Sequence, residues 1–359
     1  MTLPKPRKIQ IERYVEGLSQ FKKIDNPIKL SANESALGPS PRAIEAFERE
    51  KDKIFKYPES DSSSLRDIIS KRFDINAERI ICGAGSDQIF DLTCQLFIEP
   101  GDEVVVTEYG FIMHRIYASL YGAKVLLAKE KNFKASVDEI LKKVTDKTKI
   151  VFVANPNNPT ATYLSKNEML NLRQKLRNDI LLVVDDAYFE FLDKDDFTSG
   201  LDLFKDEANV LITRTFSKIY GLAGLRLGWG YSSKEIIDIM YQIKPPFNVN
   251  RAALCSGIEA IRDNEWIKRA IEHNTLWSKK IFSVLKECNI QTNEPTTNFF
   301  LMNFDETKIN SDEAFEKLAD NRLLLRKMMQ YKIPNALRLT IGNKKSNELF
   351  VECIRSIFK

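Results

Sequence analysis

The chain has 359 residues, of which 43% are hydrophobic and 29% charged, so it is long enough for about two globular domains. Its 54 basic and 50 acidic residues are spread along the whole chain, which argues against nucleic acid as a partner. No apolar run is suited to a signal peptide or a membrane span, and the five cysteines contain no C-x-x-C pair, so we expect a cytoplasmic protein with no membrane partner.

Short apolar runs alternate with helical patterns between residues 78 and 231. The runs are, in order, RIICG, EVVVT, KVLLA, KIVFVAN, DILLVVD, NVLIT and LGWGY. Continuous runs of this kind are typical of strands that are buried on both faces of a parallel sheet. Ser-x-x-Glu capping boxes mark helix starts at Ser136, Ser165 and Ser232. The sequence therefore predicts an α/β fold with a mostly parallel, seven-stranded sheet flanked by helices.

The pattern changes after this core. Adjacent prolines in KPPF, residues 244–247, end a helix because they remove amide donors and restrict the preceding residue. A long helical stretch follows, and then the apparent strands NFFLMNF and ALRLTIG around another helix. We therefore predict a large α/β domain at residues 46–254 and a small α+β domain formed by residues 1–45 and 255–359.

Three polar clusters follow predicted strands, at the edge where open α/β sheets bind ligands. GAGSDQ places Ser86 and Asp87 at a helix start, which suits an anion but also fits an ordinary turn. In NPNNPT, Asn158 is available to a ligand or to its own turn. In LLVVDDAYFEF, Asp185 ends an apolar strand, and a helix-capping role for Asp185 or Asp186 is as consistent with the pattern as a functional one.

A fourth cluster, TRTFSKIYGLAGLRLGWGY at residues 213–231, surrounds Lys218 with glycines. An isolated lysine is usually a surface group, but here Ser217 precedes it and Arg226 follows eight positions later. A Schiff base with pyridoxal phosphate needs a lysine amine, an aspartate for the ring nitrogen and donors for the phosphate. Asp185, Lys218, Ser217 and Arg226 are residues of these types, so the sequence predicts pyridoxal 5'-phosphate as the cofactor.

With these four clusters, the chain resembles the fold-type I aminotransferases, and among them it is most similar to histidinol-phosphate aminotransferases. The resemblance runs in the same order over nearly the whole chain, through LSANES, YPES, GAGSDQ, NPNNPT, VDDAY, TFSKIYGLAGLRLG, PFNVN and LRLTIG. It implies a homodimer with shared active sites, without a metal. It also implies an exchange of histidinol phosphate and 2-oxoglutarate with imidazole-acetol phosphate and glutamate, in histidine biosynthesis.

Roles for the catalytic residues follow from the resemblance. Lys218 is expected to hold the cofactor and then to move a proton, and Asp185 is expected to pair with the ring nitrogen. Asn158 and Tyr188 are expected to contact the ring oxygen. Phe111 is expected to stack on the ring, with Tyr109 as the alternative.

The remaining expected contacts also follow from the resemblance. The cofactor phosphate is expected to be bound by Ser86, Asp87, Ser217 and Arg226, with Tyr57 contributed by the second subunit. The substrate is expected to contact Asn33, Arg338 at its α-substituent and Arg326 at its distal phosphate. Pro334 and Asn335, between the two arginines, suggest a turn that brings both toward one cleft. Simple pairing of Arg326 with a surface carboxylate stays open.

Three departures from the family pattern bear on substrate shape: Ser35-Ala36 in place of Asn-Pro, Ala161 in place of glycine and His114 in place of tyrosine. An aromatic amino-acid aminotransferase and a threonine-phosphate decarboxylase-like enzyme stay open, because they share the cofactor residues. A silent pyridoxal-phosphate-binding regulator is disfavoured because no helix-turn-helix with a basic face is evident. A dinucleotide-binding oxidoreductase is disfavoured because no G-x-G-x-x-G motif follows the first strand.

Overall fold

The computed structural model describes residues 11–21 and 24–358. The strands are β1 (Ile28–Lys29), β2 (Ile80–Gly83), β3 (Glu103–Thr107), β4 (Lys124–Ala128), β5 (Thr148–Ala154), β6 (Leu181–Asp185), β7 (Val210–Thr215), β8 (Gly228–Tyr231), β9 (Phe299–Asn303), β10 (Leu323–Leu324), β11 (Arg326–Lys327) and β12 (Ala336–Thr340). The helices are α1 (Pro41–Glu50), α2 (Ser63–Phe73), α3 (Ser86–Phe97), α4 (Ile112–Leu120), α5 (Val137–Lys143), α6 (Lys166–Lys175), α7 (Gly200–Phe204), α8 (Lys234–Ile243), α9 (Arg251–Arg262), α10 (Asn264–Glu287), α11 (Ser311–Asp320) and α12 (Lys344–Phe358). Within the described ranges, no helix has the length and apolar character needed to cross a bilayer.

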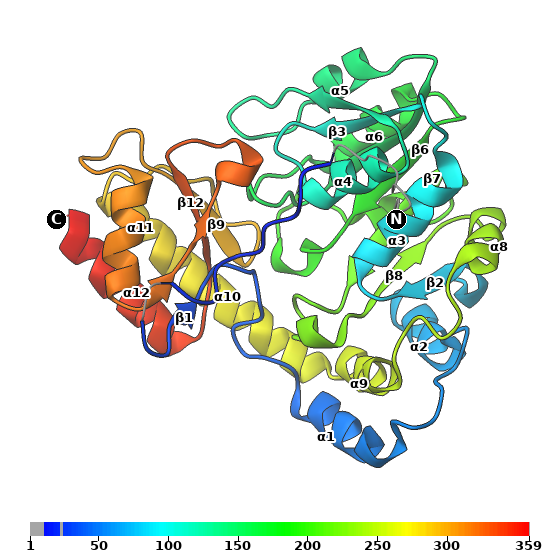
Figure 1. Cartoon of the computed structure of the whole chain (residues 1–359), viewed down its shortest axis with the longest axis horizontal. Coiled ribbons are helices and arrows are strands. Elements are labelled where there is room, and N and C mark those ends of the chain that lie inside the picture. The colour runs from blue at the N-terminus through cyan, green and yellow to red at the C-terminus, as the bar shows by residue number, and fades with distance from the viewer. Residues whose placement is uncertain (1–10, 22–23, 359) are drawn as a thin grey trace, which may run out of the picture.

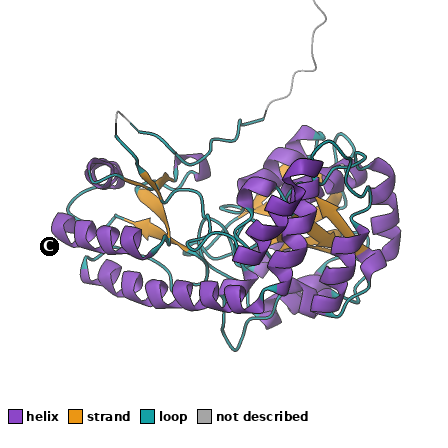
Figure 2. Ribbon diagram, turned by 90° about the horizontal axis from the view of Figure 1, so that it is seen from below, coloured by secondary structure: helices purple, strands orange, loops and turns teal. Residues whose placement is uncertain are grey.

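The larger sheet has seven strands in the order β2-β8-β7-β6-β5-β3-β4. All neighbours are parallel except β8, which runs antiparallel to both β2 and β7. Figure 2 shows helices on both faces of this sheet. The central strands β5, β6 and β7 are therefore buried along nearly their whole length, and the predicted mostly parallel, seven-stranded sheet is confirmed.

The carboxyl ends of the central strands lie at one edge of this sheet. Ala154 at the end of β5 is the register partner of Asp185 at the end of β6, and Asp185 is in turn the partner of Thr213 in β7. Because parallel strands place their carboxyl ends together, the polar clusters that follow them converge at that edge.

A second, smaller sheet of order β11-β12-β9 lies apart from the first and is packed by α10, α11 and α12 (Figure 1). β1 pairs with β10 in parallel, and Leu30 belongs to the same apolar cluster, so a segment near the amino terminus joins this region. Helix α1 instead packs on α9, and Ala43 and Ala253 belong to the core of the larger sheet. The division into two domains at residues 46 and 255 stays a prediction. Residue 46 lies within α1 and residue 255 lies within α9.

The helix starts follow the predicted capping residues with one correction. Ser165 and Glu168 form a complete capping box at α6, and the Ser136 hydroxyl accepts from the Glu139 amide at α5. The box predicted from Ser232 is wrong by one residue, because Ser233 caps α8. The Ser232 hydroxyl instead donates to the carbonyl of Val210 at 2.8 Å, a partner that only the folded sheet provides. Helix α8 ends at Ile243, as the prolines of KPPF predicted.

Candidate active site

A cavity of about 420 Å³ opens at the carboxyl edge of the larger sheet and extends to the smaller one. The predicted site residues that line it are Asn33, Ser86, Asp87, Phe111, Asn158, Asp185, Tyr188, Ser217, Lys218, Arg226, Arg326 and Arg338. Tyr57 and Tyr109 are not among its lining residues. The structure thus brings together side chains that lie up to 305 positions apart, from Asn33 to Arg338.

Lys218 lies in the loop that follows β7, and its Nζ is 5.6 Å from the centroid of the Tyr188 ring. Burial is the main cause that lowers the pKa of this amine to about 8, and the positive charge of Arg338 lowers it further. An amine with this pKa is neutral in a substantial fraction of molecules near physiological pH. Lys218 is therefore suited to act both as a nucleophile and as a base.

Asp185 is buried at the end of β6 and its two carboxylate oxygens have different neighbours. The Thr213 hydroxyl donates to Oδ1 at 3.3 Å, and His114 Nε2 lies 3.6 Å from Oδ2. His114 is itself held by stacking on Phe152, with ring centroids 4.7 Å apart. These contacts fix the direction in which the carboxylate faces the cavity.

Neither aspartate is the N-cap residue that the sequence left open: Ser199 caps α7, and the neighbouring Asp186 binds the first amides of that helix. Its carboxylate accepts from the amides of Gly200 and Leu201 at the start of α7, at 3.1 and 3.3 Å. Arg214 lies 3.5 Å from the same carboxylate. Since the Asp186 carboxylate binds α7 and lies near Arg214, Asp185 is the aspartate that lines the cavity.

Backbone amides at the start of α3 face a cationic side chain. Arg226 donates to the Ser217 hydroxyl at 3.3 Å and to Asp87 Oδ2 at 3.2 Å. Burial raises the pKa of Asp87, whereas Arg226 opposes that rise. A helix amino terminus carries free N–H groups and a partial positive charge, so this corner of the cavity is suited to an anion.

Two glycines leave the space in which this corner is built. A Cβ on Gly228 would lie 2.4 Å from the Ser86 amide nitrogen, and a Cβ on Gly85 would lie 2.5 Å from Arg226 Nη2. Gly85 also has a φ of +82°, which side-chain-bearing residues rarely adopt. Gly228, in the Lys218 segment, therefore leaves the space in which the start of α3 forms the anion-binding corner of the cavity.

At the opposite side of the cavity, Arg326 and Arg338 are only 6% and 5% exposed. Arg338 donates to Asn158 Oδ1 at 2.5 Å and to the Ser31 carbonyl at 2.9 Å, and its Nε has no hydrogen-bond partner among the described residues. Arg326 donates to the Val15 carbonyl and to Gln330 Oε1. Within residues 11–21 and 24–358, no carboxylate forms an ion pair with either guanidinium. Among the described residues, Arg326 is therefore not paired with a surface carboxylate, which was the alternative that the sequence left open.

A hydrogen-bonded set connects the two sides of the cavity. Asn33 donates from Nδ2 to the Tyr188 hydroxyl at 2.9 Å, and the Thr340 hydroxyl donates to Asn33 Oδ1 at 3.1 Å. Burial raises the pKa of Tyr188 to about 12, so its hydroxyl keeps its proton and remains a donor. The Asn158 amide faces Arg338 rather than its own turn, and Asn157 makes the turn contact to Thr160.

The aromatic residues separate into those inside and outside the cavity. Phe111 lines it and packs edge-on against His114, whereas Tyr109 packs on Phe133. This placement favours Phe111 over Tyr109 as the residue that stacks on a ring. Tyr57 is 77% exposed and stacks on Phe247 with centroids 4.5 Å apart, away from the cavity of its own chain.

The sequence interpretation missed the contribution of residues near the amino terminus. Tyr14, Glu16 and Gly17 line the cavity beside Arg326. The side chain of Gln330 holds this segment by donating to the Arg13 carbonyl at 2.8 Å and accepting from the Val15 amide at 3.2 Å. No periodicity or strand pattern marks these residues, so no signal in the sequence pointed to them.

Comparisons with protein families, curated proteins and solved structures all find aminotransferases. The family model described as aminotransferase class I and II matches residues 25–354. A histidinol-phosphate aminotransferase of Pelagibacter ubique is 52% identical over 359 residues and covers 100% of each chain, and one of Maricaulis maris is 40% identical over 357 residues and covers 99% of each. The crystal structure of a histidinol-phosphate aminotransferase from Sinorhizobium meliloti in complex with pyridoxal-5'-phosphate has a TM-score of 0.84 at 22% identity, over 91% of this chain and 90% of that one.

Proposed function

We propose that this chain, which belongs to the family of class I and II aminotransferases, converts imidazole-acetol phosphate and glutamate to histidinol phosphate and 2-oxoglutarate. It is a pyridoxal-phosphate-dependent transaminase. Relatives named histidinol-phosphate aminotransferase support the substrate along the full length of the chain. The observation that carries the proposal is the pair of buried arginines that line the same cavity as Lys218, because such a pair suits a phosphorylated or doubly anionic substrate.

The residues present fit pyridoxal phosphate. The start of α3, with Arg226 and Ser217, is an anion corner that a Cβ at Gly228 would fill. Lys218 supplies an amine of lowered pKa, and Asp185 supplies a buried carboxylate. We infer that Ser86, Asp87, Ser217 and Arg226 bind the phosphate, Lys218 holds the aldehyde carbon, and Phe111 covers the ring.

The bound cofactor supplies a ring that accepts the electron pair left when a proton leaves the substrate Cα. Asp185 holds the proton on the ring nitrogen, because its buried carboxylate stabilises a positive charge there. Asn158 and Tyr188 orient the ring oxygen with an amide and a hydroxyl. Lys218 would move the proton between the substrate Cα and the cofactor's C4′ atom, as an amine that is neutral in part of the molecules can do.

Substrate recognition is assigned to the opposite wall. Arg338 binds the α-carboxylate of glutamate and the corresponding substituent of histidinol phosphate, and Arg326 binds the distal anionic group. The hydrogen bonds from Arg338 to Asn158 and to the Ser31 carbonyl orient its guanidinium. Asn33 keeps the Tyr188 hydroxyl in place beside it. Loss of either arginine leaves the substrate anion without its charge-assisted donors.

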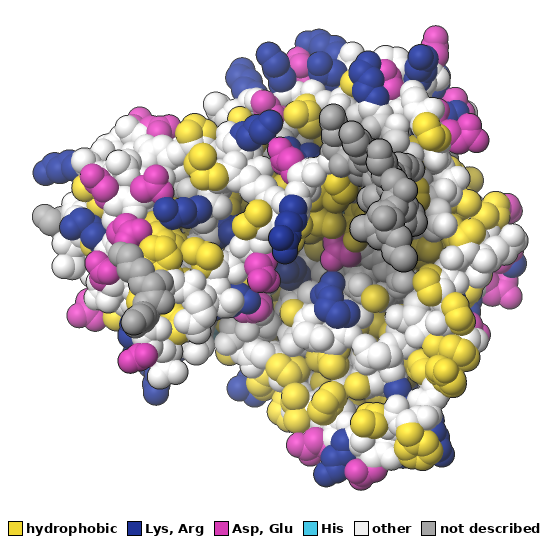
Figure 3. All heavy atoms as spheres, viewed as in Figure 1, with side chains coloured by type: hydrophobic (Ala, Val, Ile, Leu, Met, Phe, Trp, Pro, Cys, Tyr) yellow, Lys and Arg dark blue, Asp and Glu magenta, His cyan; other side chains and the backbone are white. Residues whose placement is uncertain are grey.

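The proposal includes a homodimer in the cytoplasm, in which Tyr57 reaches the cofactor phosphate of the partner subunit. Exposed apolar side chains support an interface around α1 and the segment after it: Ile44, Phe47, Ile54, Phe55 and Tyr57. Figure 3 shows apolar side chains gathered in this part of the molecule, at the lower edge of the view. The five cysteines without a C-x-x-C pair fit a reducing compartment.

Two measurements test the proposal. Borohydride reduction of the protein loaded with pyridoxal phosphate, followed by peptide mass mapping, should place the adduct on Lys218. An adduct on another lysine, or none, contradicts the assigned cofactor site. A panel of amino donors with 2-oxoglutarate should give the highest kcat/KM with histidinol phosphate. If phenylalanine or tyrosine is the better donor, the enzyme is an aromatic aminotransferase instead.

A further inference from the structure

The turn that follows α8 touches the phosphate-binding corner directly. Asn248 Nδ2 donates to Gln88 Oε1 at 2.8 Å and to the Cys82 carbonyl at 3.0 Å. Gln88 lies in the first turn of α3, and its Oε1 also accepts from the Ala84 amide at 2.8 Å. One carboxamide oxygen thus joins Asn248 to the glycine loop that leads into Ser86. Asn248 fixes both the end of β2 and the start of α3.

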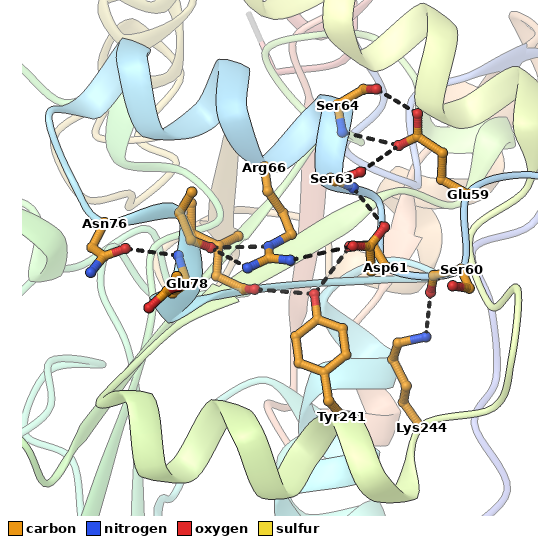
Figure 4. A network of polar contacts seen from close by, with 12 residues as sticks. Glu59, Ser60, Asp61, Ser63, Ser64, Arg66, Asn76, Glu78, Tyr241 and Lys244 are labelled. Atoms are coloured by element: carbon orange, nitrogen blue, oxygen red, sulfur yellow. Dashed lines mark hydrogen bonds and ion pairs between the residues drawn. The ribbon is translucent and has the colours of Figure 1, made fainter.

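The same turn is bound to the loop that carries Tyr57. Lys244 Nζ donates to Asn248 Oδ1 at 3.3 Å and to the Ser60 carbonyl at 2.6 Å. Figure 4 shows the Lys244 contact beside the Tyr241 hydroxyl, which donates to the Asp61 carbonyl at 3.1 Å. The Tyr57 ring stacks on Phe247 of the same turn. The turn after α8 and the loop that carries Tyr57, which are remote in sequence, are therefore joined by hydrogen bonds and a ring contact.

We propose that Asn248 and Lys244 are positioning residues that hold the phosphate-binding corner and the Tyr57 loop in one hydrogen-bonded frame. The inference rests on the proposed function, in which Ser86 and Asp87 serve the phosphate in one site and Tyr57 serves the phosphate in the partner's site. Neither Asn248 nor Lys244 lines the cavity, so each acts through other groups. The frame sets how tightly the cofactor phosphate is held and leaves the proton transfers to Lys218 and Asp185.

These hydrogen bonds predict that the loss of Asn248 or Lys244 affects cofactor binding rather than amino transfer. Without the Asn248 amide, Gln88 Oε1 loses one of its two donors and the Cys82 carbonyl loses its side-chain donor. The start of α3 then samples positions in which its amides no longer converge on one anion. Without the Lys244 ammonium, the Ser60 carbonyl loses its donor and the Tyr57 loop is less firmly placed. Both losses weaken cofactor binding, and the amino transfer itself is preserved once the cofactor is bound.

The experiment is a titration of cofactor-free dimer with pyridoxal phosphate, followed by kcat at saturating cofactor. Asn248→Leu should raise the cofactor Kd about tenfold, since a lost neutral hydrogen bond is worth a factor of about two to ten. Its kcat should stay within about twofold of the wild-type value, because no reacting group is changed. Lys244→Met should raise the Kd about threefold, and Lys244→Arg should restore it by keeping a donor.

Two controls separate positioning from general stability. Asn76→Ala removes a cap on the neighbouring short helix Ala77–Arg79, drawn in Figure 4, and should lower the melting temperature without changing the Kd. Lys244→Met should add little to the Kd of Tyr57→Phe, because the shortest contact of Lys244, to the Ser60 carbonyl, acts through the Tyr57 loop. If Asn248→Leu changes only the melting temperature, or if the Lys244 and Tyr57 effects are additive, the positioning role is overturned. If the unmutated chain binds no pyridoxal phosphate, that result overturns the proposed function and this inference together.

Discussion

Arg326 of β11 and Arg338 of β12 are direct partners across an antiparallel strand pair. Two like charges in that position destabilise the strand pair, and both side chains are almost completely buried. Burial is the first cause that lowers the pKa of Arg338, and the charge of Arg326 contributes to it. The strand pair thus carries a repulsion between like charges that an anion bound beside both side chains would reduce. This pair of buried cations is the reason why we propose that the wall opposite Lys218 binds the anionic groups of the substrate.

Removal of Arg326 should therefore separate phosphorylated from unphosphorylated substrates. Charge-assisted hydrogen bonds contribute about 1.5–3 kcal/mol each, so Arg326→Ala should lower kcat/KM for histidinol phosphate about ten- to a hundredfold. The kcat/KM for phenylalanine or tyrosine should hardly change. Steady-state kinetics with both substrate classes measure the difference.

The matched control is Lys327→Ala, which removes the adjacent cation of the same strand. Lys327 pairs with Asp312, with its side chain 37% exposed, and does not line the cavity. This variant should leave both substrates unaffected. An equal loss for both substrate classes in Arg326→Ala would mean that Arg326 supports the cavity wall rather than binding the phosphate.

The strands and the turn between the two arginines were predictable from local sequence. Seven apolar runs became the seven strands of the larger sheet, because short apolar, β-branched runs that alternate with helical patterns favour strands of a parallel sheet covered by helices. Pro334 and Asn335 indicated the turn that places Arg326 opposite Arg338. The lysine segment indicated its chemistry because Ser217 and Arg226 flank Lys218 at fixed separations.

Other parts of the site depend on contacts that no local pattern encodes. The Gln330 side chain pairs with the backbone of Arg13 and Val15, more than 300 positions earlier in the chain. Ser232 and Ser233 are equivalent as caps in sequence, and only the Val210 carbonyl across the sheet decides between them. The division of labour between Asp185 and Asp186 likewise follows from where α7 begins. These choices are made by tertiary packing.

A hybrid dimer should show whether Tyr57 acts on the partner's cofactor. We expect Tyr57→Phe to weaken cofactor binding and Lys218→Ala to abolish transamination while leaving the chain folded. Two differently tagged chains, one with each change, can be co-expressed and the hybrid isolated through both tags. If sites are shared, one site of the hybrid carries both defects and the other carries neither. The hybrid should then bind cofactor at its active site with wild-type affinity and have about half the wild-type activity.

The parental homodimers serve as controls for that measurement. In a site built from one chain alone, the hybrid would contain one Tyr57→Phe site and one Lys218→Ala site. Its cofactor affinity would then stay at the Tyr57→Phe level, and its activity would be about half that of the Tyr57→Phe homodimer. That outcome would remove Tyr57 from the shared site and leave its exposed ring as part of the apolar surface only.

The lowered pKa of Lys218 gives a pH dependence. In the cofactor-free protein, the rate of covalent capture of pyridoxal phosphate should rise with pH as the amine loses its proton, with a midpoint near 8 rather than at the ordinary 10.5. At pH 7, about one amine in ten is then neutral, against about one in three thousand for an ordinary lysine. Because the folded chain loses this proton before the unfolded chain does, the free energy of unfolding should also rise with pH between 8 and 10.5.

Arg338→Leu tests the cause of that shift. The positive charge of Arg338 is the second largest cause, after burial, of the lowered pKa of Lys218. Its removal should therefore move the midpoint of cofactor capture upward, toward 10.5. Stopped-flow absorbance over a pH series measures both midpoints. A wild-type midpoint near 10.5, or one that Arg338→Leu does not move, would contradict the electrostatic account.

The glycine at position 228 should matter through the amide of Ser86. An alanine Cβ there would lie 2.4 Å from the Ser86 nitrogen, closer than side chains approach backbone, so the start of α3 must shift. Because that amide is assigned to the cofactor phosphate, Gly228→Ala should raise the Kd for pyridoxal phosphate about tenfold, the value of one charge-assisted hydrogen bond.

Gly224→Ala is the matched control in the same segment, since a Cβ there has no neighbour within 4 Å among the described residues. Gly342→Ala introduces an equally close contact, 2.4 Å from the Ser346 hydroxyl, far from the phosphate corner, and reports the effect of lost stability alone. If Gly228→Ala changes the melting temperature as Gly342→Ala does but leaves the Kd unchanged, the start of α3 does not bind the phosphate.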